Sequence, residues 1–167
     1  TGQLLLRKPN HPKDKFQRVV ITFQKSDGVK LGSTSYELRF CDMRIFGKMI
    51  LIQKKDLSKF TEKYGYDALN TDLTPEIFLK ALKSKRTIIK NALLDQKKIS
   101  GLGNIYATDA LFLSGIHPET LTKNIDLKMA GTLLNNARLV LNEGIKNRGS
   151  TLNDEMYVDV FGKPGKQ

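Results

Sequence analysis

The sequence predicts an α+β fold, with strands in the first third of the chain and helices in the remainder. Three observations carry this prediction: β-rich runs near the start, a well-marked helix start at residues 74–76, and an apolar stripe at helical spacing over 126–147. The 167 residues, 40% of them hydrophobic, are enough to bury a substantial core. We expect three parts: strands at 1–55, a linker with a short helix at 56–73, and a helical domain at 74–167.

The strand prediction rests on runs of β-branched and aromatic residues. Residues 18–23 (RVVITF) and 35–40 (SYELRF) flank Asp27-Gly28, a dipeptide typical of a tight hairpin turn. A third run at 48–52 (KMILI) follows Gly47, and we expect it to complete a small antiparallel sheet.

The helix prediction begins with a short helix at 56–60. At Thr74, Pro75 and Glu76 the chain combines an N-cap residue, a proline at the first helical position and an acid in the first turn. Further helices are expected at about 87–95, 104–114 and 126–147. The last helix has one apolar stripe, which we assign to the core: Leu127, Ala130, Leu133, Leu134, Ala137, Leu141 and Ile145.

Charge and cysteine content narrow the function. With 28 Lys+Arg against 17 Asp+Glu, the net charge is +11 and the pI about 9.7, which favours a polyanionic partner such as nucleic acid. Cys41 is the single cysteine, so a disulfide framework is excluded; we expect a buried thiol and a reducing compartment, such as the bacterial cytoplasm near the nucleoid. No run approaches the roughly 20 apolar residues of a membrane span, and we expect no export signal.

A glycine-containing turn carries the main functional hypothesis. Residues 99–107 (ISGLGNIYA) place Gly101 and Gly103 directly before a predicted helix, where free N–H groups and the helix dipole favour a phosphate, and Asn104 adds a side-chain donor. Basic residues surround this turn in the sequence: Lys83, Lys85, Arg86, Lys90, Lys97 and Lys98. The alternative is an ordinary helix connection with a glycine C-cap.

Two longer strings resemble a known family. Residues 93–118 (LLDQKKISGLGNIYATDALFLSGIHP) resemble the helix-two-turn-helix module of formamidopyrimidine-DNA glycosylases, base-excision enzymes that remove oxidised purines such as 8-oxoguanine and formamidopyrimidines. Residues 40–47 (FCDMRIFG) resemble the family's Asp-Pro-Arg-Arg-Phe-Gly loop, which inserts an arginine and a phenylalanine where the damaged nucleotide has left the duplex. Arg44 and Phe46 fall on those positions, whereas Met43 and Ile45 depart from the pattern.

Shorter matches extend the resemblance. Lys85, Arg86 and Lys90 match a basic run that contacts phosphates in the family. Residues 161–165 (FGKPG) resemble a segment beside the loop that closes over an extruded oxidised guanine, and Lys163 matches its lysine; a solvated lysine in a glycine turn is the alternative. Residues 1–4 resemble the end of a DNA-inserting strand, and residues 16–18 replace a histidine-containing strand start.

The resemblance implies a partial N-terminal β-sandwich followed by a helix-two-turn-helix domain with the start of the lesion-recognition loop. It also implies a monomer that binds duplex DNA containing a lesion or an abasic site, without a membrane. The implied DNA-binding residues are Arg44, Phe46, Lys85, Arg86, Lys90, Gly101, Gly103, Asn104 and Lys163.

The family's chemistry depends on residues that these 167 lack. It uses an N-terminal proline as nucleophile, the glutamate after it as proton carrier, and a C-terminal zinc finger. We therefore expect the parent protein to be a glycosylase/AP lyase holding zinc in that finger. We expect the chain as written to have no catalytic residue, no cofactor and no excision activity.

Two other functions remain open: a stand-alone, non-catalytic binder of distorted duplex DNA, and an RNA-binding or ribosomal protein with a similar two-turn module. His117, Asp95 and Asp109 could suggest metal or acid-base chemistry, but they have no partners at ligand spacing, and we expect structural roles for them.

Overall fold

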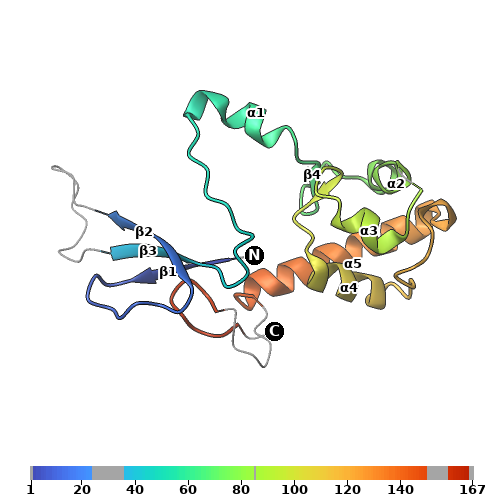
Figure 1. Cartoon of the computed structure of the whole chain (residues 1–167). Coiled ribbons are helices and arrows are strands. Elements are labelled where there is room, and N and C mark those ends of the chain that lie inside the picture. The colour runs from blue at the N-terminus through green and yellow to red at the C-terminus, as the bar shows by residue number, and fades with distance from the viewer. Residues whose placement is uncertain (1, 24–35, 85, 150–157, 166–167) are drawn as a thin grey trace. The chain divides into compact units, whose positions relative to one another are not determined.

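The structure is a computed structural model that describes residues 2–23, 36–84, 86–149 and 158–165 (Figure 1). It confirms the α+β class and divides into two compact units. The strand unit comprises Thr1–Leu51 and Lys146–Gln167, and the helical unit comprises Ile52–Ile145.

The division differs from the predicted boundaries because residues 146–167 group with the strands and not with the helices. Backbone and side-chain hydrogen bonds explain the difference. The N–H of Leu6 donates to the carbonyl of Val160 at 2.7 Å, and the N–H of Val158 donates to Oε1 of Gln3 at 3.2 Å. The last described segment is thereby attached to the first strand.

The strand unit contains a three-stranded antiparallel sheet in the order β1-β3-β2. Its strands are β1 (Gln3–Arg7), β2 (Gln17–Phe23) and β3 (Tyr36–Cys41). Strands β2 and β3 correspond to the two predicted runs, while the predicted turn at Asp27-Gly28 lies outside the described residues. Cys41 is buried as predicted, and burial raises the pKa of its thiol.

The predicted strand at 48–52 is wrong. That segment has no regular structure, and Leu51 is fully exposed. The physical reason is that the central strand β3 already pairs with β1 on one edge and with β2 on the other. The third strand is β1, formed by residues that the sequence analysis had only matched to the end of a family strand.

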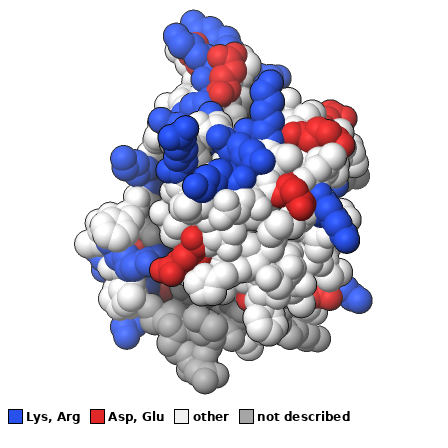
Figure 2. Space-filling view, turned by 90° about the vertical axis from the view of Figure 1, so that its right-hand side faces the viewer, with Lys and Arg blue, Asp and Glu red and all other residues white. Residues whose placement is uncertain are grey.

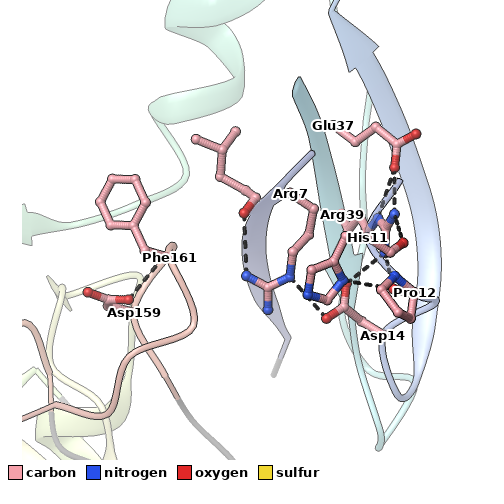
Figure 3. Close-up of polar contacts among 9 residues, drawn as sticks. Arg7, His11, Pro12, Asp14, Glu37, Arg39, Asp159 and Phe161 are labelled. Atoms are coloured by element: carbon pink, nitrogen blue, oxygen red, sulfur yellow. Dashed lines mark hydrogen bonds and ion pairs between the residues drawn. The ribbon is translucent and has the colours of Figure 1, made fainter. Parts of the chain in front are cut away.

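A buried arginine secures the chain between β1 and β2 to the sheet (Figure 3). Arg39 is 4% exposed; it forms ion pairs with Asp14 at 3.0 Å and Glu37 at 2.8 Å. It also donates to the backbone carbonyls of Pro12 at 2.6 Å and His11 at 2.9 Å. The hydrogen bonding that Arg39 donates to the Glu37 carboxylate is the main cause that raises the pKa of Arg39, so this guanidinium stays charged despite its burial.

The helical unit confirms the predicted helices with small shifts at their ends. A 3-10 turn, η1 (Lys54–Asp56), leads into the short helix α1 (Leu57–Thr61). Helix α2 (Pro75–Lys83) starts as predicted, with the Thr74 hydroxyl accepting from the N–H of Ile77 at 3.4 Å. The remaining elements are α3 (Ile89–Leu94), α4 (Asn104–Leu113), η2 (Thr122–Asn124) and α5 (Leu127–Lys146).

Helices α2, α3 and α4 gather around α5 and share one core with it (Figure 1). The stripe of α5 is buried as predicted from Ala130 to Leu141, whereas Leu127 and Ile145 at its ends are 45% and 66% exposed. Across the core, Arg138 of α5 donates to the carbonyls of Ala68, Asn70 and Leu73. These bonds attach the segment before α2 to the longest helix.

A two-stranded parallel ladder positions the turn that precedes α4. It joins β4 (Tyr66–Asp67) to β5 (Ile99–Ser100), pairing Tyr66 with Ile99.

Within the described residues, no helix is long and apolar enough to cross a membrane.

Candidate nucleic-acid interface

In the strand unit, the loop after β3 is bracketed by one carboxylate. Asp42 is 3% exposed; its Oδ1 accepts from the N–H of Arg44 at 3.1 Å, and its Oδ2 accepts from the N–H of Gly47 at 2.6 Å. Hydrogen bonds to a charged acceptor are among the stronger ones in proteins. Asp42 therefore gives residues 43–47 a defined shape without secondary structure.

The backbone of this loop is unusual at two places. Ile45 has a φ of 59°, a left-handed conformation that costs energy for a β-branched residue. At Gly47, a Cβ would stand 2.5 Å from Cζ of Phe40, so a side chain there would require the ring to move. Strained backbone of this kind persists only where its surroundings enforce it, and here the Asp42 bracket does so.

The loop directs apolar side chains into solvent. Phe46 is 73% exposed, Ile45 is 68% exposed and Met43 is 47% exposed, while Arg44 between them is also exposed. A cluster of large apolar residues held out of the core indicates a binding surface. The exposure of Arg44 and Phe46 suits their predicted insertion into DNA. Met43 and Ile45, the two residues that depart from the family pattern, belong to the same exposed cluster.

The backbone of Asp42 is held by β2 and by the residue before that strand. The N–H of Asp42 donates to the carbonyl of Phe16 at 3.0 Å, and Nε of Arg18 donates to the carbonyl of Asp42, also at 3.0 Å. The Arg39 network of Figure 3 fixes the segment that leads into Phe16. Loop 43–47 thus rests on the sheet through successive polar contacts.

In the helical unit, the predicted phosphate turn lies between β5 and α4. Gly101 has a φ of +90°, a conformation that favours glycine. Leu102 points into the core at 1% exposure. Gly103 is extended, at φ −98° and ψ −179°, and a Cβ there would meet nothing within 4 Å. Backbone strain therefore does not require glycine at 103; the open space beside it is what a closely approaching phosphate would need.

The start of α4 carries donors without an acidic cap. Gly103 is the N-cap residue, no side chain accepts a hydrogen bond there, and the first turn holds no acid. The first N–H groups of a helix have no intrahelical acceptor and carry the positive end of the helix dipole. Asn104, the first helical residue, is exposed.

Basic side chains accompany this turn. Arg86 and Lys97 are exposed, and Lys90 and Lys98 are partly exposed. Lys85 lies outside the described residues. Figure 2 shows Lys and Arg gathered on the upper half of one face, above a broad uncharged area. Lys97 and Lys98 also line an open cleft of about 480 Å³ against α2 and α3.

Lys163 lies in a tight turn of the strand unit. Val158 bridges to Pro164, and Oδ1 of Asp159 accepts from the N–H groups of Phe161 at 3.0 Å and Lys163 at 2.8 Å. These bonds, the one from Lys163 being the larger cause, lower the pKa of Asp159. The Lys163 side chain is exposed, and nothing in the turn distinguishes a DNA contact from a solvated lysine.

The predicted site residues therefore form two groups. Arg44, Phe46 and Lys163 belong to the strand unit, and Arg86, Lys90 and the turn at 101–104 belong to the helical unit.

Two of the candidates for metal or acid-base chemistry accept hydrogen bonds from backbone N–H groups close by in the sequence. Nδ1 of His117 accepts from the N–H of Glu119, and Asp95 accepts from the N–H of Lys97. In the part of the chain that the structure describes, no three His, Cys, Asp or Glu side chains gather as a metal site.

Sequence reasoning missed Asp42. It was read only as part of a matching string, although an Asp directly before an exposed segment that ends in glycine is a common signal for a side chain that accepts backbone hydrogen bonds.

The comparisons with known proteins point to one family. Residues 64–156 match the formamidopyrimidine-DNA glycosylase H2TH domain. The formamidopyrimidine-DNA glycosylase of Trichodesmium erythraeum is 38% identical over 162 residues, covering 95% of this chain and 54% of that protein. That of Herpetosiphon aurantiacus is 33% identical over 166 residues, covering 99% and 57%. The chain thus spans about half the length of the curated relatives it matches.

Solved structures agree. The Lactococcus lactis Fpg in complex with abasic-site DNA superposes with a TM-score of 0.78 at 25% identity, covering 99% of this chain and 57% of that one. MutM in complex with DNA containing carbocyclic 8-oxo-G gives a TM-score of 0.78 at 26% identity, covering 99% and 56%. Because the H2TH model covers more than half of the chain and the relatives align along nearly all of it, this protein belongs to the formamidopyrimidine-DNA glycosylase family.

Proposed function

We propose that these residues form the DNA-holding part of a base-excision repair enzyme, a bifunctional glycosylase/AP lyase that removes oxidised purines from duplex DNA. Family membership and the likeness to Fpg bound to abasic-site DNA support the proposal. We assign only binding to the 167 residues. The proline nucleophile and the zinc finger would belong to segments outside them, and both stay predictions.

The observation that carries the proposal is the open turn before α4. Gly101 and Gly103 bring the backbone to the surface, the helix start offers uncapped N–H donors, and the net charge of +11 favours a polyanion. A phosphate placed against residues 101–104 would find backbone donors, the Asn104 amide and nearby lysines. We propose Arg86 and Lys90 as further phosphate contacts, and Lys85 by resemblance alone.

The loop at 43–47 would supply preference for damaged DNA. A nucleotide that leaves the stack leaves a gap, and an exposed aromatic ring fills such a gap while a guanidinium donates to the orphaned base. Phe46 and Arg44 have the required exposure and chemistry. We propose Lys163 as a contact near the extruded base.

The test is binding of the 167-residue chain to a short duplex containing a tetrahydrofuran abasic-site analogue, measured by fluorescence anisotropy at several salt concentrations. Arg86→Ala should weaken binding and reduce the slope of log K against log salt by about 0.9 for one lost charge contact with a phosphate. Asn104→Ala removes an uncharged donor, so it should weaken binding at every salt concentration with little change in slope. Asn142 offers a matched control for Asn104, because among the described residues its exposed amide donates only to the Arg138 carbonyl of its own helix. Unchanged affinity in Asn104→Ala together with an unchanged slope in Arg86→Ala would refute the phosphate turn.

A competition arm separates nucleic acids. Structured RNA should displace the chain less readily than abasic duplex DNA. Preference for RNA would instead favour the ribosomal type of two-turn module.

A further inference from the structure

The side chain of Gln96 contacts the phosphate turn at two points. Its Oε1 accepts from the N–H of Gly101 at 3.1 Å, and its Nε2 donates to the carbonyl of Leu102 at 2.8 Å. The same Nε2 lies 3.4 Å from the carbonyl of Leu94, at the end of α3. The amide of Gln96 therefore joins the end of α3 to two peptide groups of the turn, Ser100–Gly101 and Leu102–Gly103.

The backbone of Gln96 is fixed independently of its side chain. Its carbonyl accepts from the N–H of Gly65 at 2.9 Å, and the hydroxyl of Ser100 donates to the carbonyl of Gly65 at 3.1 Å. The β4–β5 ladder thus holds both ends of the segment 96–100. The backbone position from which the Gln96 side chain extends is therefore fixed.

Beyond Ser100 the turn has little other support. Among the described residues, the N–H of Gly101 and the carbonyl of Leu102 have no hydrogen-bond partner except Gln96. The Leu102 side chain is anchored in the core, but burial of a side chain does not set the rotation of the peptide groups on either side of it. The bond from Nε2 of Gln96 to the Leu102 carbonyl does set the rotation of the Leu102–Gly103 peptide group, and the bond to Oε1 fixes the Ser100–Gly101 peptide group at the start of the turn.

The orientation of the Leu102 carbonyl has a direct consequence for the next donor. In a trans peptide the C=O and N–H groups point in opposite directions. Because Gln96 holds the Leu102 carbonyl toward itself, the N–H of Gly103 in the same peptide points away from Gln96. That N–H immediately precedes the uncapped start of α4, and no atom lies within 4 Å of where a Gly103 side chain would begin.

We propose that Gln96 is a positioning residue for DNA binding, whose amide orients the peptide groups of residues 101–103 so that the Gly103 N–H and the first N–H groups of α4 converge on one phosphate. This inference rests on the proposed function. An amide suits the task because it accepts at one end and donates at the other. A glutamate would place a carboxylate oxygen against the Leu102 carbonyl oxygen, and two acceptors cannot form a hydrogen bond. It would also add negative charge beside the phosphate.

The test compares Gln96→Met, which keeps length and shape but removes both hydrogen bonds, with Gln53→Met as a control at an exposed glutamine. Gln96→Met should weaken binding to the tetrahydrofuran duplex roughly tenfold, the size expected for losing a hydrogen bond to a charged group. Because neither glutamine nor methionine carries a charge, the salt slope should stay close to that of the unmutated chain. Gln53→Met should match the unmutated chain in both respects.

A double-mutant cycle separates positioning from plain stabilisation. If Gln96 acts through the turn, adding Gln96→Met to Asn104→Ala should cost much less binding than it does alone. A purely structural residue would instead lower the melting temperature and give additive losses of binding, and this result would overturn the inference. Gln96→Glu should weaken binding more than Gln96→Met.

Amide hydrogen exchange on the unmutated chain provides a test that does not depend on a variant folding. The Gly101 N–H should be protected without DNA, whereas the Gly103 N–H should exchange rapidly and become protected when the duplex is added. Rapid exchange at Gly101, or no change at Gly103 on binding, would overturn the inference. Failure of the unmutated chain to bind any duplex would refute the proposed function as well. Binding that weakens on Asn104→Ala but not on Gln96→Met would refute the inference alone.

Discussion

Replacement of Gly103 by alanine separates binding from stability in the phosphate turn. The residue is extended, with φ −98° and ψ −179°, so alanine adopts the same backbone without strain, and its methyl group would meet no atom within 4 Å. Neither backbone strain nor crowding by the described residues requires glycine there. If a phosphate approaches at this point, the methyl group occupies part of its space.

The expected changes in free energy follow from that geometry. Alanine restricts the unfolded chain, which stabilises the fold by about 0.4–1 kcal/mol. As an N-cap residue it is worse than glycine, which offsets part of that gain, so the free energy of unfolding should change by no more than about 0.5 kcal/mol. Displacing the phosphate from its backbone donors should cost about 1.5–3 kcal/mol of binding, tenfold or more in Kd.

Gly115 provides the reciprocal control. It also has nothing within 4 Å of a built Cβ, but its φ is +64°. Gly115→Ala should therefore lower the free energy of unfolding by about 1–2 kcal/mol through left-handed strain and leave DNA binding unchanged. Thermal unfolding and anisotropy on both variants measure the two effects. Unchanged DNA affinity in Gly103→Ala would refute the assignment of residues 101–104 as a phosphate-binding turn. A clear loss of stability in the same variant would refute the conclusion that the protein leaves room for a methyl group at residue 103.

Three further predictions concern the strand unit. Asp42→Ala or Phe46→Ala should reduce the preference for abasic over intact duplex in competitive anisotropy, because the first frees the loop and the second removes the ring; equal loss on both duplexes would contradict the wedge. Arg39→Leu should lower the free energy of unfolding by about 1.5–3 kcal/mol in urea, since the partly buried carboxylate of Glu37 loses its ion pair with Arg39 and that of Asp14 keeps its ion pair with Arg7 but loses the one with Arg39; a loss below about 1 kcal/mol would mean that the carboxylates find other partners. The pKa of Asp159 is lowered in the folded chain, so its contribution to stability is complete above the ordinary aspartate pKa and lost as the pH falls through the lowered value. The stability difference between the unmutated chain and Asp159→Asn should accordingly shrink on acidification, and a difference that grows would contradict this sign.

The parts of the fold that depend on local sequence could be predicted. Thr74 and Pro75 mark a helix start by chemistry that acts within one turn, and the stripe of α5 reports burial through its 3.6-residue period. The turn at 101–104 was identified for a similar reason, because glycines directly before a helical pattern are a local signal for a turn. Strands β2 and β3 were identified by composition.

The misses in the fold depend on contacts between distant segments. Residues 48–52 have the composition of a strand, but pairing is decided by which edges of β3 remain open, and β1 and β2 occupy both. Residues 158–165 join the strand unit through bonds to Gln3 and Leu6, more than 150 residues earlier in the chain. Neither a period nor a composition records such pairings.

Both candidate contact sites are built in the same way. This explains why the sequence could suggest residues of each loop but not the side chain that holds the loop in place. At each site a short polar side chain brackets a loop that lacks regular structure, and its chemistry matches the groups it receives. Asp42 accepts from two N–H groups, whereas Gln96 accepts one N–H and donates to one carbonyl. Each bracket acts within its own unit, so each loop is shaped before DNA arrives, and little binding energy is spent on ordering it. Since the brackets share no partner, the losses caused by Asp42→Ala and Gln96→Met should add, in contrast to the coupled loss expected for Gln96→Met with Asn104→Ala. If each loop is shaped independently, binding losses should add when the two substitutions lie in different units. They should be coupled when both substitutions lie in the helical unit.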